Sequence, residues 1–254
     1  MKTMRLETRD ALRVLRFDKP RGNAIDPEFV DDLSQAAGAI AADASVRGVL
    51  LASAHPKLFS PGLDLQFLCE LDRPAMGAFM ARFARAVWAL YGLKKPVVAA
   101  VSGHAIAGGC ILAMTADFRV LKRGAQIGLN EVKVGVPLPW SVALLLRASA
   151  PPEALSRVAL LGRNFSDAEA VAAGLADEIA EADGFEQLCL ARLQEFAEKD
   201  AYSLGVTKGY LRAGALREME AREDDLQREW LDAWFSPATR ERIQQTLAAL
   251  KAKA

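Results

Sequence analysis

The sequence predicts a mixed α/β or α+β fold in which helices cover both faces of a sheet. Short apolar strands alternate with helix-like segments through the first half of the chain. These strands are nearly continuous apolar runs, which is typical of a sheet buried on both sides. The second half is dominated by helix-like segments rich in Ala, Leu, Glu and Arg. We therefore expect a sheet-containing core followed by a set of C-terminal helices.

The elements of the first half follow from local patterns. Residues 11–18 (ALRVLRFD) alternate apolar and polar side chains, as a half-buried strand does. Residues 27–43 form an amphipathic pattern with Asp26 at the N-cap and Pro27 at the first helical position. We expect further strands at 47–53, 95–103 and 118–122, and helices from 65 towards 90 and at 108–118.

The second half reads as helical with one late strand. The strand is expected at 175–180 (LADEIA). The helices are expected at 151–162, 166–174, 185–199, 204–214, 218–235 and 237–254. We place a domain boundary near residue 198, with a core at 1–198 and a helical oligomerisation region at 199–254. Trp230, Trp234 and Phe235 recur at helical spacing and are interpreted as core or subunit interface.

Composition limits the classes of function. The chain has 32 Lys and Arg residues against 32 Asp and Glu, so no overall field attracts nucleic acid or an anionic membrane. Three cysteines (Cys69, Cys110 and Cys189) form no CxxC pair, which favours reduced thiols. The first residues lack the apolar region of a signal peptide, and no apolar run reaches the roughly 18 residues that span a bilayer. We expect a cytoplasmic protein with no membrane partner.

Two glycine-containing stretches each join a strand to a helix. In FSPGLDL (59–65) the glycine permits a positive-φ turn and Asp64 can cap a helix that begins at Leu65. In GHAIAGGC (103–110), Gly108 and Gly109 allow close backbone approach at a helix start. Both turns could point free N–H groups at an anionic oxygen, and both could equally be tight packing connections. Neither is a phosphate loop, because no Gly-Lys-Ser/Thr follows.

A third stretch, IGLNEVKVG (127–135), places Glu131 alone in apolar surroundings. Such an acid is either a solvated loop residue or a group kept for chemistry. The histidines are His55 and His104, and neither they nor Ser60, Ser141 or Cys110 form a triad pattern. No HExxH or acidic metal-ligand cluster is present. Any chemistry is therefore expected to use a carboxylate with backbone N–H donors, and no metal.

Together these stretches resemble the crotonase (enoyl-CoA hydratase/isomerase) superfamily. The resemblance covers nearly the whole chain through KPRGNAID, FSPGLDL, KPVVAAVSGHAIAGGCILAMTADFRV and QIGLNEVKVGVPLPW, in that order. It implies a spiral of repeated ββα units with C-terminal helices that assemble a homotrimer or a dimer of trimers. It also implies an acyl-coenzyme A thioester substrate, with coenzyme A as part of the substrate and no separate cofactor.

The resemblance assigns roles to individual residues. It implies an oxyanion hole made by the backbone N–H groups of Leu63 and Gly108, with Glu131 as the catalytic acid–base group. The substrate-binding residues that it implies are Pro61, Gly62, Leu63, Asp64, Leu65, Gly108, Ile111 and Asn130. Pro61 departs from the small residue usual in the family and lacks an N–H, but it leaves the Leu63 donor in place.

The carboxylates favour one subgroup. Hydratases of this family use two glutamates, and the first of these positions is Ile111 here. A single base suffices to move a double bond by taking a proton from C2 and returning it to C4. The chain is thus most similar to the mitochondrial-type Δ3,Δ2-enoyl-CoA (dodecenoyl-CoA) isomerases, which act in β-oxidation of fatty acids. Alternatives are another crotonase-type enzyme (hydratase, thioesterase, decarboxylase or dehalogenase) and a non-catalytic acyl-CoA or RNA binder.

Overall fold

The computed structural model describes residues 1–20 and 22–251. Arg21, within the KPRGNAID stretch, lies outside the described residues. The strands are β1 (Met4–Arg9), β2 (Leu12–Phe17), β3 (Gly48–Ser53), β4 (Leu58–Ser60), β5 (Val97–Val101), β6 (His104–Ile106), β7 (Phe118–Lys122), β8 (Gln126–Gly128), β9 (Phe165–Ser166) and β10 (Glu178–Ala180). The helices are α1 (Pro27–Ala42), α2 (Leu65–Leu68), α3 (Arg73–Tyr91), α4 (Gly108–Met114), α5 (Glu131–Val134), α6 (Trp140–Ser149), α7 (Leu155–Ala159), α8 (Asp167–Ala172), α9 (Phe185–Ala197), α10 (Ala201–Trp234) and α11 (Pro237–Lys251), with a 3-10 turn η1 (Pro152–Ala154) before α7.

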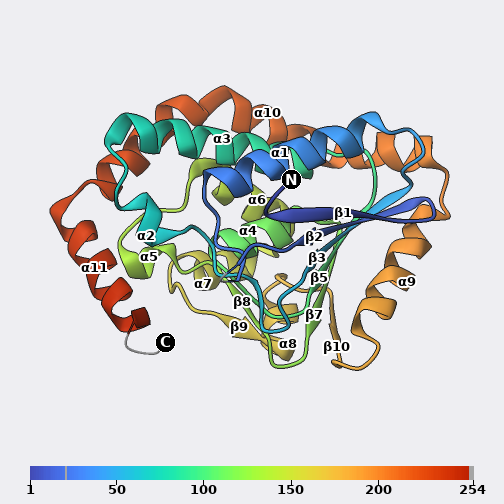
Figure 1. The fold of residues 1–254 in the computed structure, drawn as a ribbon. Helices are drawn as coiled ribbons and strands as arrows, with labels where there is room; N and C mark the ends of the chain where they lie inside the picture. The colour runs from blue at the N-terminus through green and yellow to red at the C-terminus, as the bar shows by residue number, and fades with distance from the viewer. Residues whose placement is uncertain (21, 252–254) are drawn as a thin grey trace.

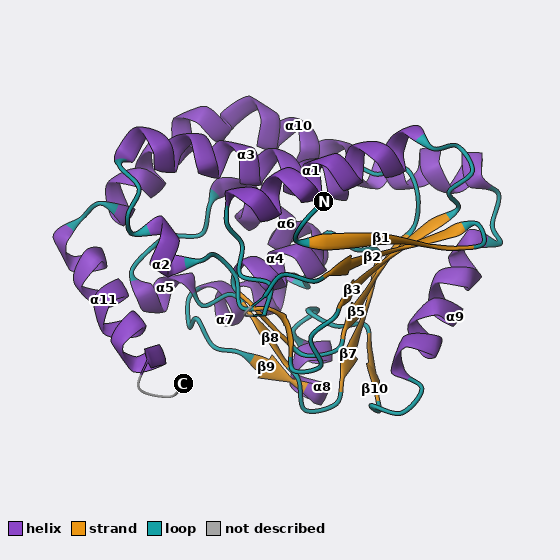
Figure 2. Ribbon diagram, viewed as in Figure 1, coloured by secondary structure: helices purple, strands orange, loops and turns teal. Residues whose placement is uncertain are grey.

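The main sheet has six strands in the order β1-β2-β3-β5-β7-β10. β1 and β2 form an antiparallel hairpin whose turn contains Asp10 at φ 53°. The other neighbours, from β2 to β10, pair in parallel and are connected through helices (Figure 2). The predicted strands at 11–18, 47–53, 95–103 and 118–122 are confirmed as β2, β3, β5 and β7.

Both faces of the main sheet are buried, as the apolar strands predict. Alternate side chains such as Val14 and Leu50 pack against α9. The residues between them, such as Leu15 and Leu51, join the larger core with α1, α3 and α4. Figure 1 shows α9 beside the sheet, apart from the layer of α1, α3 and α10. The mixed α/β class with covered sheet faces is therefore confirmed.

A second sheet of four short strands brings the three glycine and glutamate stretches together. Its order is β4-β6-β8-β9, with β4, β6 and β8 parallel. β4 leads into the turn at Gly62, β6 into α4, and β8 into α5. Because the carboxyl ends of parallel strands meet at one edge of a sheet, the starts of α2, α4 and α5 lie close together. These strands have two or three residues each, too few for a periodic pattern, so they were missed as a sheet.

One C-terminal helix is longer than predicted. Separate helices at 204–214 and 218–235 are wrong, because one helix, α10, runs from Ala201 to Trp234. Gly214 lowers helix propensity by only about 1 kcal/mol, so it does not end the helix. α10 packs against α3 and α6, and α11 packs against α2 and α5 (Figure 1). The division at residue 198 stays a prediction. No helix in the described ranges is long and apolar enough to cross a membrane.

Candidate active site

A partly enclosed cavity of about 300 Å³ lies where the starts of α2, α4 and α5 meet. Helices α3, α10 and α11 complete its wall. The lining is apolar except for Asn130, Glu131 and Thr246, and Glu131 is its one charged side chain among the residues described. The lining residues are Pro61, Leu63, Leu65, Met80, Phe83, Ile106, Ala107, Gly108, Ile111, Asn130, Glu131, Val134, Val136, Pro139, Trp230, Trp234 and Thr246.

Glu131 is the first residue of α5 and points its carboxylate into apolar surroundings. The residue as a whole is partly exposed, but its Oε2 atom is buried and has no hydrogen-bond partner among the described residues. Burial raises the pKa of Glu131 from 4.5 to about 7, opposed only by its own backbone N–H. This carboxyl therefore exchanges a proton near neutral pH, which is what a general base requires.

The position that could hold a second acid is apolar. Ile111 lies in the first turns of α4, is 2% exposed and lines the same cavity. An isoleucine offers no acceptor to hold or activate a water molecule. The cavity thus contains one proton acceptor with a raised pKa and a hydrocarbon wall beside it.

Both histidines have other hydrogen-bonding roles. The Nε2 atom of His55 lies 2.7 Å from the carbonyl oxygen of Lys19. The Nδ1 atom of His104 accepts a 3.0 Å hydrogen bond from the backbone N–H of Gln126. Neither imidazole is part of the cavity lining, so Glu131 carries the acid–base capacity of that lining.

Two glycines bring the backbone of Leu63 beside that of Gly108. Gly62 has φ +94°, and a β-carbon there would lie 2.9 Å from the backbone nitrogen of Gly108. A β-carbon on Gly108 would lie 3.4 Å from the backbone nitrogen of Leu63. Within the described residues neither N–H has a hydrogen-bond partner. Gly108 is also the first residue of α4, where N–H groups have no intrahelical partner. Two free donors therefore border one small space.

Ala107 holds these donors in an unusual conformation. It precedes α4 with φ 49° and ψ −116°, a region that non-glycine residues rarely adopt. Its N–H donates a 2.8 Å hydrogen bond to the carbonyl oxygen of Gly128, at the end of β8. Such strain costs roughly 1–3 kcal/mol and collects at functional sites. The turn at 107 thus links the start of α4 to the strand that leads to Glu131.

The implied substrate-binding residues divide into two groups. Pro61, Leu63, Leu65, Gly108, Ile111 and Asn130 line the cavity with Glu131. Gly62 and Asp64 do not line it. Gly62 permits the close approach to Gly108, and Asp64 caps α2 by accepting a hydrogen bond from the N–H of Phe67. The N-cap roles predicted for Asp26 and Asp64 are both confirmed.

Four large apolar residues of the lining were missed as cavity residues. Met80 and Phe83 come from α3, and Trp230 and Trp234 from α10. The two indole rings stack with centroids 5.2 Å apart and are 4% and 1% exposed. The prediction that they belong to the core is confirmed. Their spacing of four residues gives them one helix face, but no local signal reveals that this face meets Glu131.

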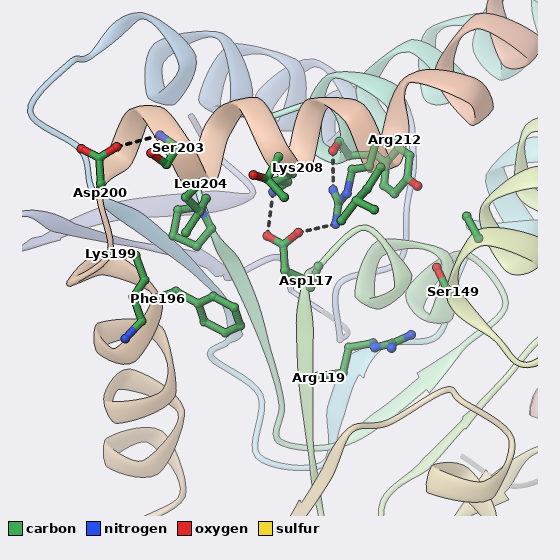
Figure 3. Close-up of a pocket in the computed structure, with 16 residues that line it drawn as sticks. Asp117, Arg119, Ser149, Phe196, Lys199, Asp200, Ser203, Leu204, Lys208 and Arg212 are labelled. Carbon is green, nitrogen blue, oxygen red and sulfur yellow. Dashed lines mark hydrogen bonds and ion pairs between the residues drawn. The ribbon is translucent and has the colours of Figure 1, made fainter.

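A second, larger cavity of about 680 Å³ lies between α6, α9, α10 and the main sheet. Asp117 stands on its wall, and Figure 3 shows Lys208 and Arg212 reaching it from α10. The Lys208 ammonium and the Arg212 guanidinium each donate to Asp117 at 2.6 Å, and the backbone N–H of Val97 donates at 2.7 Å. This carboxylate is fully paired, in contrast to Glu131.

Comparisons with known proteins agree on one family. Residues 7–249 match the family model described as enoyl-CoA hydratase/isomerase. The chain is 31% identical over 218 residues to mitochondrial enoyl-CoA delta isomerase 1 of Homo sapiens, covering 84% of this chain and 72% of that protein.

Solved structures show the same likeness. The human mitochondrial Δ3-Δ2-enoyl-CoA isomerase superposes with a TM-score of 0.95 at 25% identity, covering 99% of both chains. An enoyl-CoA hydratase from Mycobacterium marinum superposes with a TM-score of 0.83 at 29% identity, covering 90% of this chain and 99% of that one. The crotonase-type fold predicted above is thus confirmed, and structures named as an isomerase and as a hydratase share it.

Proposed function

Since the chain belongs to the enoyl-CoA hydratase/isomerase family, we propose that it is a Δ3,Δ2-enoyl-CoA isomerase of fatty acid β-oxidation. One observation carries this proposal: Glu131 is the single carboxylate in an otherwise apolar cavity whose second acid position is Ile111. The human relative named as a delta isomerase supports the same choice.

In the proposed reaction Glu131 shuttles one proton. Its ionised carboxylate takes a proton from C2 of a 3-enoyl thioester, and the electrons of that C–H bond move into a dienolate. The carboxyl then returns the proton to C4, which leaves a trans-2-enoyl thioester and the original carboxylate. A group whose pKa lies near 7 serves both steps, because it binds and releases the proton with little free-energy difference. Asn130, next to Glu131 on the lining, is proposed to orient the substrate or this carboxylate.

The negative charge of the dienolate is proposed to collect on the thioester oxygen between the N–H groups of Leu63 and Gly108. Their unpaired state and close approach support this role. Preorganised donors of this kind contribute about 10²–10³ each to the rate. The reaction moves a proton and needs neither a metal nor a redox cofactor; coenzyme A enters as part of the substrate.

Hydration of a 2-enoyl thioester is the competing reaction, and the Mycobacterium marinum relative is named as a hydratase. It requires a water activated between two acids, and Ile111 removes one of them. We expect the protein to convert 3-hexenoyl-CoA to the conjugated 2-enoyl product, followed by thioester absorbance, and to hydrate crotonyl-CoA poorly. Ile111→Glu should raise hydration above the wild-type level. Efficient hydration by the wild type would contradict the single-acid mechanism.

The alternative of an RNA-binding or purely acyl-CoA-binding protein makes the opposite prediction. It expects salt-sensitive RNA retention, or thioester binding, without turnover of 3-hexenoyl-CoA. The neutral overall charge disfavours RNA binding, and the unpaired Glu131 favours catalysis over a purely binding role. Absence of turnover with clean thioester binding would support the alternative.

The proposal includes a homotrimer or dimer of trimers in the cytoplasm. Tyr202, Tyr210 and Leu211 on α10 are 79–80% exposed, and we propose that a neighbouring subunit covers them. Light scattering should give a trimer or hexamer, and a monomer would contradict this part.

The proposed location is the cytoplasm, since three free cysteines suit a reducing compartment. The human relative is named as mitochondrial, so imaging of a fluorescent fusion is the test.

A further inference from the structure

A shared wall separates the candidate active site from a second, much smaller space. Met80, Phe83 and Pro139 line both the 300 Å³ cavity and a space of about 10 Å³ behind it. The small space is otherwise bounded by Ala84, Val87, Ser141 and Val142. About 10 Å³ admits at most one water molecule. Hydrocarbon that fills the main cavity in this direction therefore ends at the wall.

Phe83 has the largest side chain of the three residues that line both spaces. It is 3% exposed and lies on α3, so a 19-residue helix holds its ring in place. Pro139 is part of the backbone before α6, and Met80 is a flexible thioether that adapts to its neighbours. Removal of the Phe83 ring would join the two spaces. Removal of Met80 would leave the rigid ring in the way.

The volume of the main cavity sets a scale for the chain it can hold. A methylene group occupies nearly the volume of a water molecule, roughly 30 Å³. A cavity of about 300 Å³ therefore holds about ten such groups, counting the thioester carbon between Leu63, Gly108 and Glu131.

From these observations we propose that Phe83 sets the upper length of the acyl chain and that the substrates are short- and medium-chain thioesters, up to about ten carbon atoms. This inference rests on the acyl-CoA binding in the proposed function but not on the isomerase reaction. The stacked indoles of Trp230 and Trp234 line the main cavity and report on its occupancy. The chain-length limit can therefore be measured without turnover.

The test is a titration of the full-length protein with saturated acyl-CoAs from butanoyl to hexadecanoyl, followed by tryptophan fluorescence and calorimetry. In the wild type each added methylene should tighten binding about fourfold until the limit at about ten carbons, and not beyond. In Phe83→Ala the limit should move outward by about two to four carbons. Dodecanoyl-CoA should then bind at least about tenfold tighter than to the wild type.

Phe79→Ala is the matched control. Phe79 lies one turn earlier on α3, is also 3% exposed, and stacks on Phe83 at 6.5 Å between centroids. It lines neither space, so its loss disturbs the core without opening the wall. Its length limit should match the wild type. Phe83→Leu removes less of the core and should move the limit by a smaller amount. It replaces Phe83→Ala in the test if that variant does not fold.

The outcomes separate the inference from the proposed function. An unchanged limit in folded Phe83→Ala or Phe83→Leu overturns the role of Phe83. Tighter wild-type binding of hexadecanoyl-CoA than of octanoyl-CoA overturns the length limit. A length limit at Phe83 without any isomerisation contradicts only the proposed reaction. Failure of the wild type to bind any acyl-CoA contradicts the inference together with the proposed function.

Discussion

The 680 Å³ and 300 Å³ cavities each have a carboxylate on their wall, and the environments of these two carboxylates are opposite. Asp117, in the larger cavity, accepts from Val97, Lys208 and Arg212 (Figure 3). Glu131, in the smaller one, leaves Oε2 without a partner and has its pKa raised to about 7. A fully paired acid stabilises the fold, whereas an unpaired buried acid costs stability and is available for proton transfer. Pairing, not cavity size, therefore distinguishes the chemical site from the structural one.

The larger cavity also shows the effect of burial on the cations that pair with Asp117. Burial lowers the pKa of Lys208 to about 8 even though Asp117 opposes that change. The Arg212 guanidinium, also buried, donates to the carbonyl oxygens of Tyr91 and Thr115 and stacks 4.1 Å from the centre of the Tyr91 ring. These contacts tie α10 to α3 and to the end of α4. The network thus fixes the first half of α10, whereas Trp230 and Trp234 lie at its other end.

Loss of the Glu131 carboxylate should have the largest effect. Glu131→Gln keeps the shape of the side chain but cannot accept a proton, so kcat for 3-hexenoyl-CoA should fall by about 10³ or more. The dissociation constant for a saturated acyl-CoA should change by less than about threefold, since the charge takes no part in holding the thioester. Full activity in the variant would rule out Glu131 as the base.

Loss of the paired carboxylate should instead act on stability. Asp117→Asn leaves Lys208 and Arg212 without their anion, and breaking such a buried pair costs about 3–5 kcal/mol of unfolding free energy. For a chain of this size Tm should fall by about 10 °C. The KM of the folded fraction should stay unchanged. A variant with wild-type Tm would show that the network adds nothing to stability.

Glu131→Gln should also stabilise the protein at alkaline pH. The pKa in the folded state, about 7, lies above the ordinary glutamate value of 4.5, so the folded state holds this proton more tightly. The stability that this provides is complete below about pH 4.5 and is lost as the pH rises through 7, by up to about 3 kcal/mol. In denaturant unfolding at equal protein concentration, the free energy of unfolding of the variant should rise relative to that of the wild type as the pH increases from 5 to 8. An equal pH dependence for both proteins would contradict the raised pKa.

The smallest expected effect is on the pH dependence of kcat/KM, which should be the same in the wild type and in Asp117→Asn. If ionised Glu131 is the base, kcat/KM should fall about tenfold per unit below pH 7 and level off above it. Asp117 lies outside this cavity, so the folded fraction of Asp117→Asn should show the same profile. A profile that is flat from pH 5.5 to 8 would exclude Glu131 as the titrating group.

Much of the candidate site could be predicted because its chemistry sits in contiguous stretches. Gly62, Gly108 and Glu131 stand in short segments whose order matches a family. The same match places Ile111 where hydratases of that family have their first glutamate. The residues that were missed come from distant segments. Met80, Phe83, Trp230 and Trp234 look like ordinary core positions, because helix periodicity shows that a face is buried and not what it is buried against.

The sequence by itself determined the class of fold, the principal strands, the helix caps at Asp26 and Asp64, and a lone acid followed by a glycine break. These depend on interactions within a few residues, or on a repeating pattern of apolar side chains. Only the tertiary structure decided which of two buried carboxylates is unpaired. It also decided that α3 and α10 supply the hydrocarbon wall. Desolvation depends on every neighbour in space, and the neighbours of Glu131 are separated from it by up to about a hundred residues along the chain.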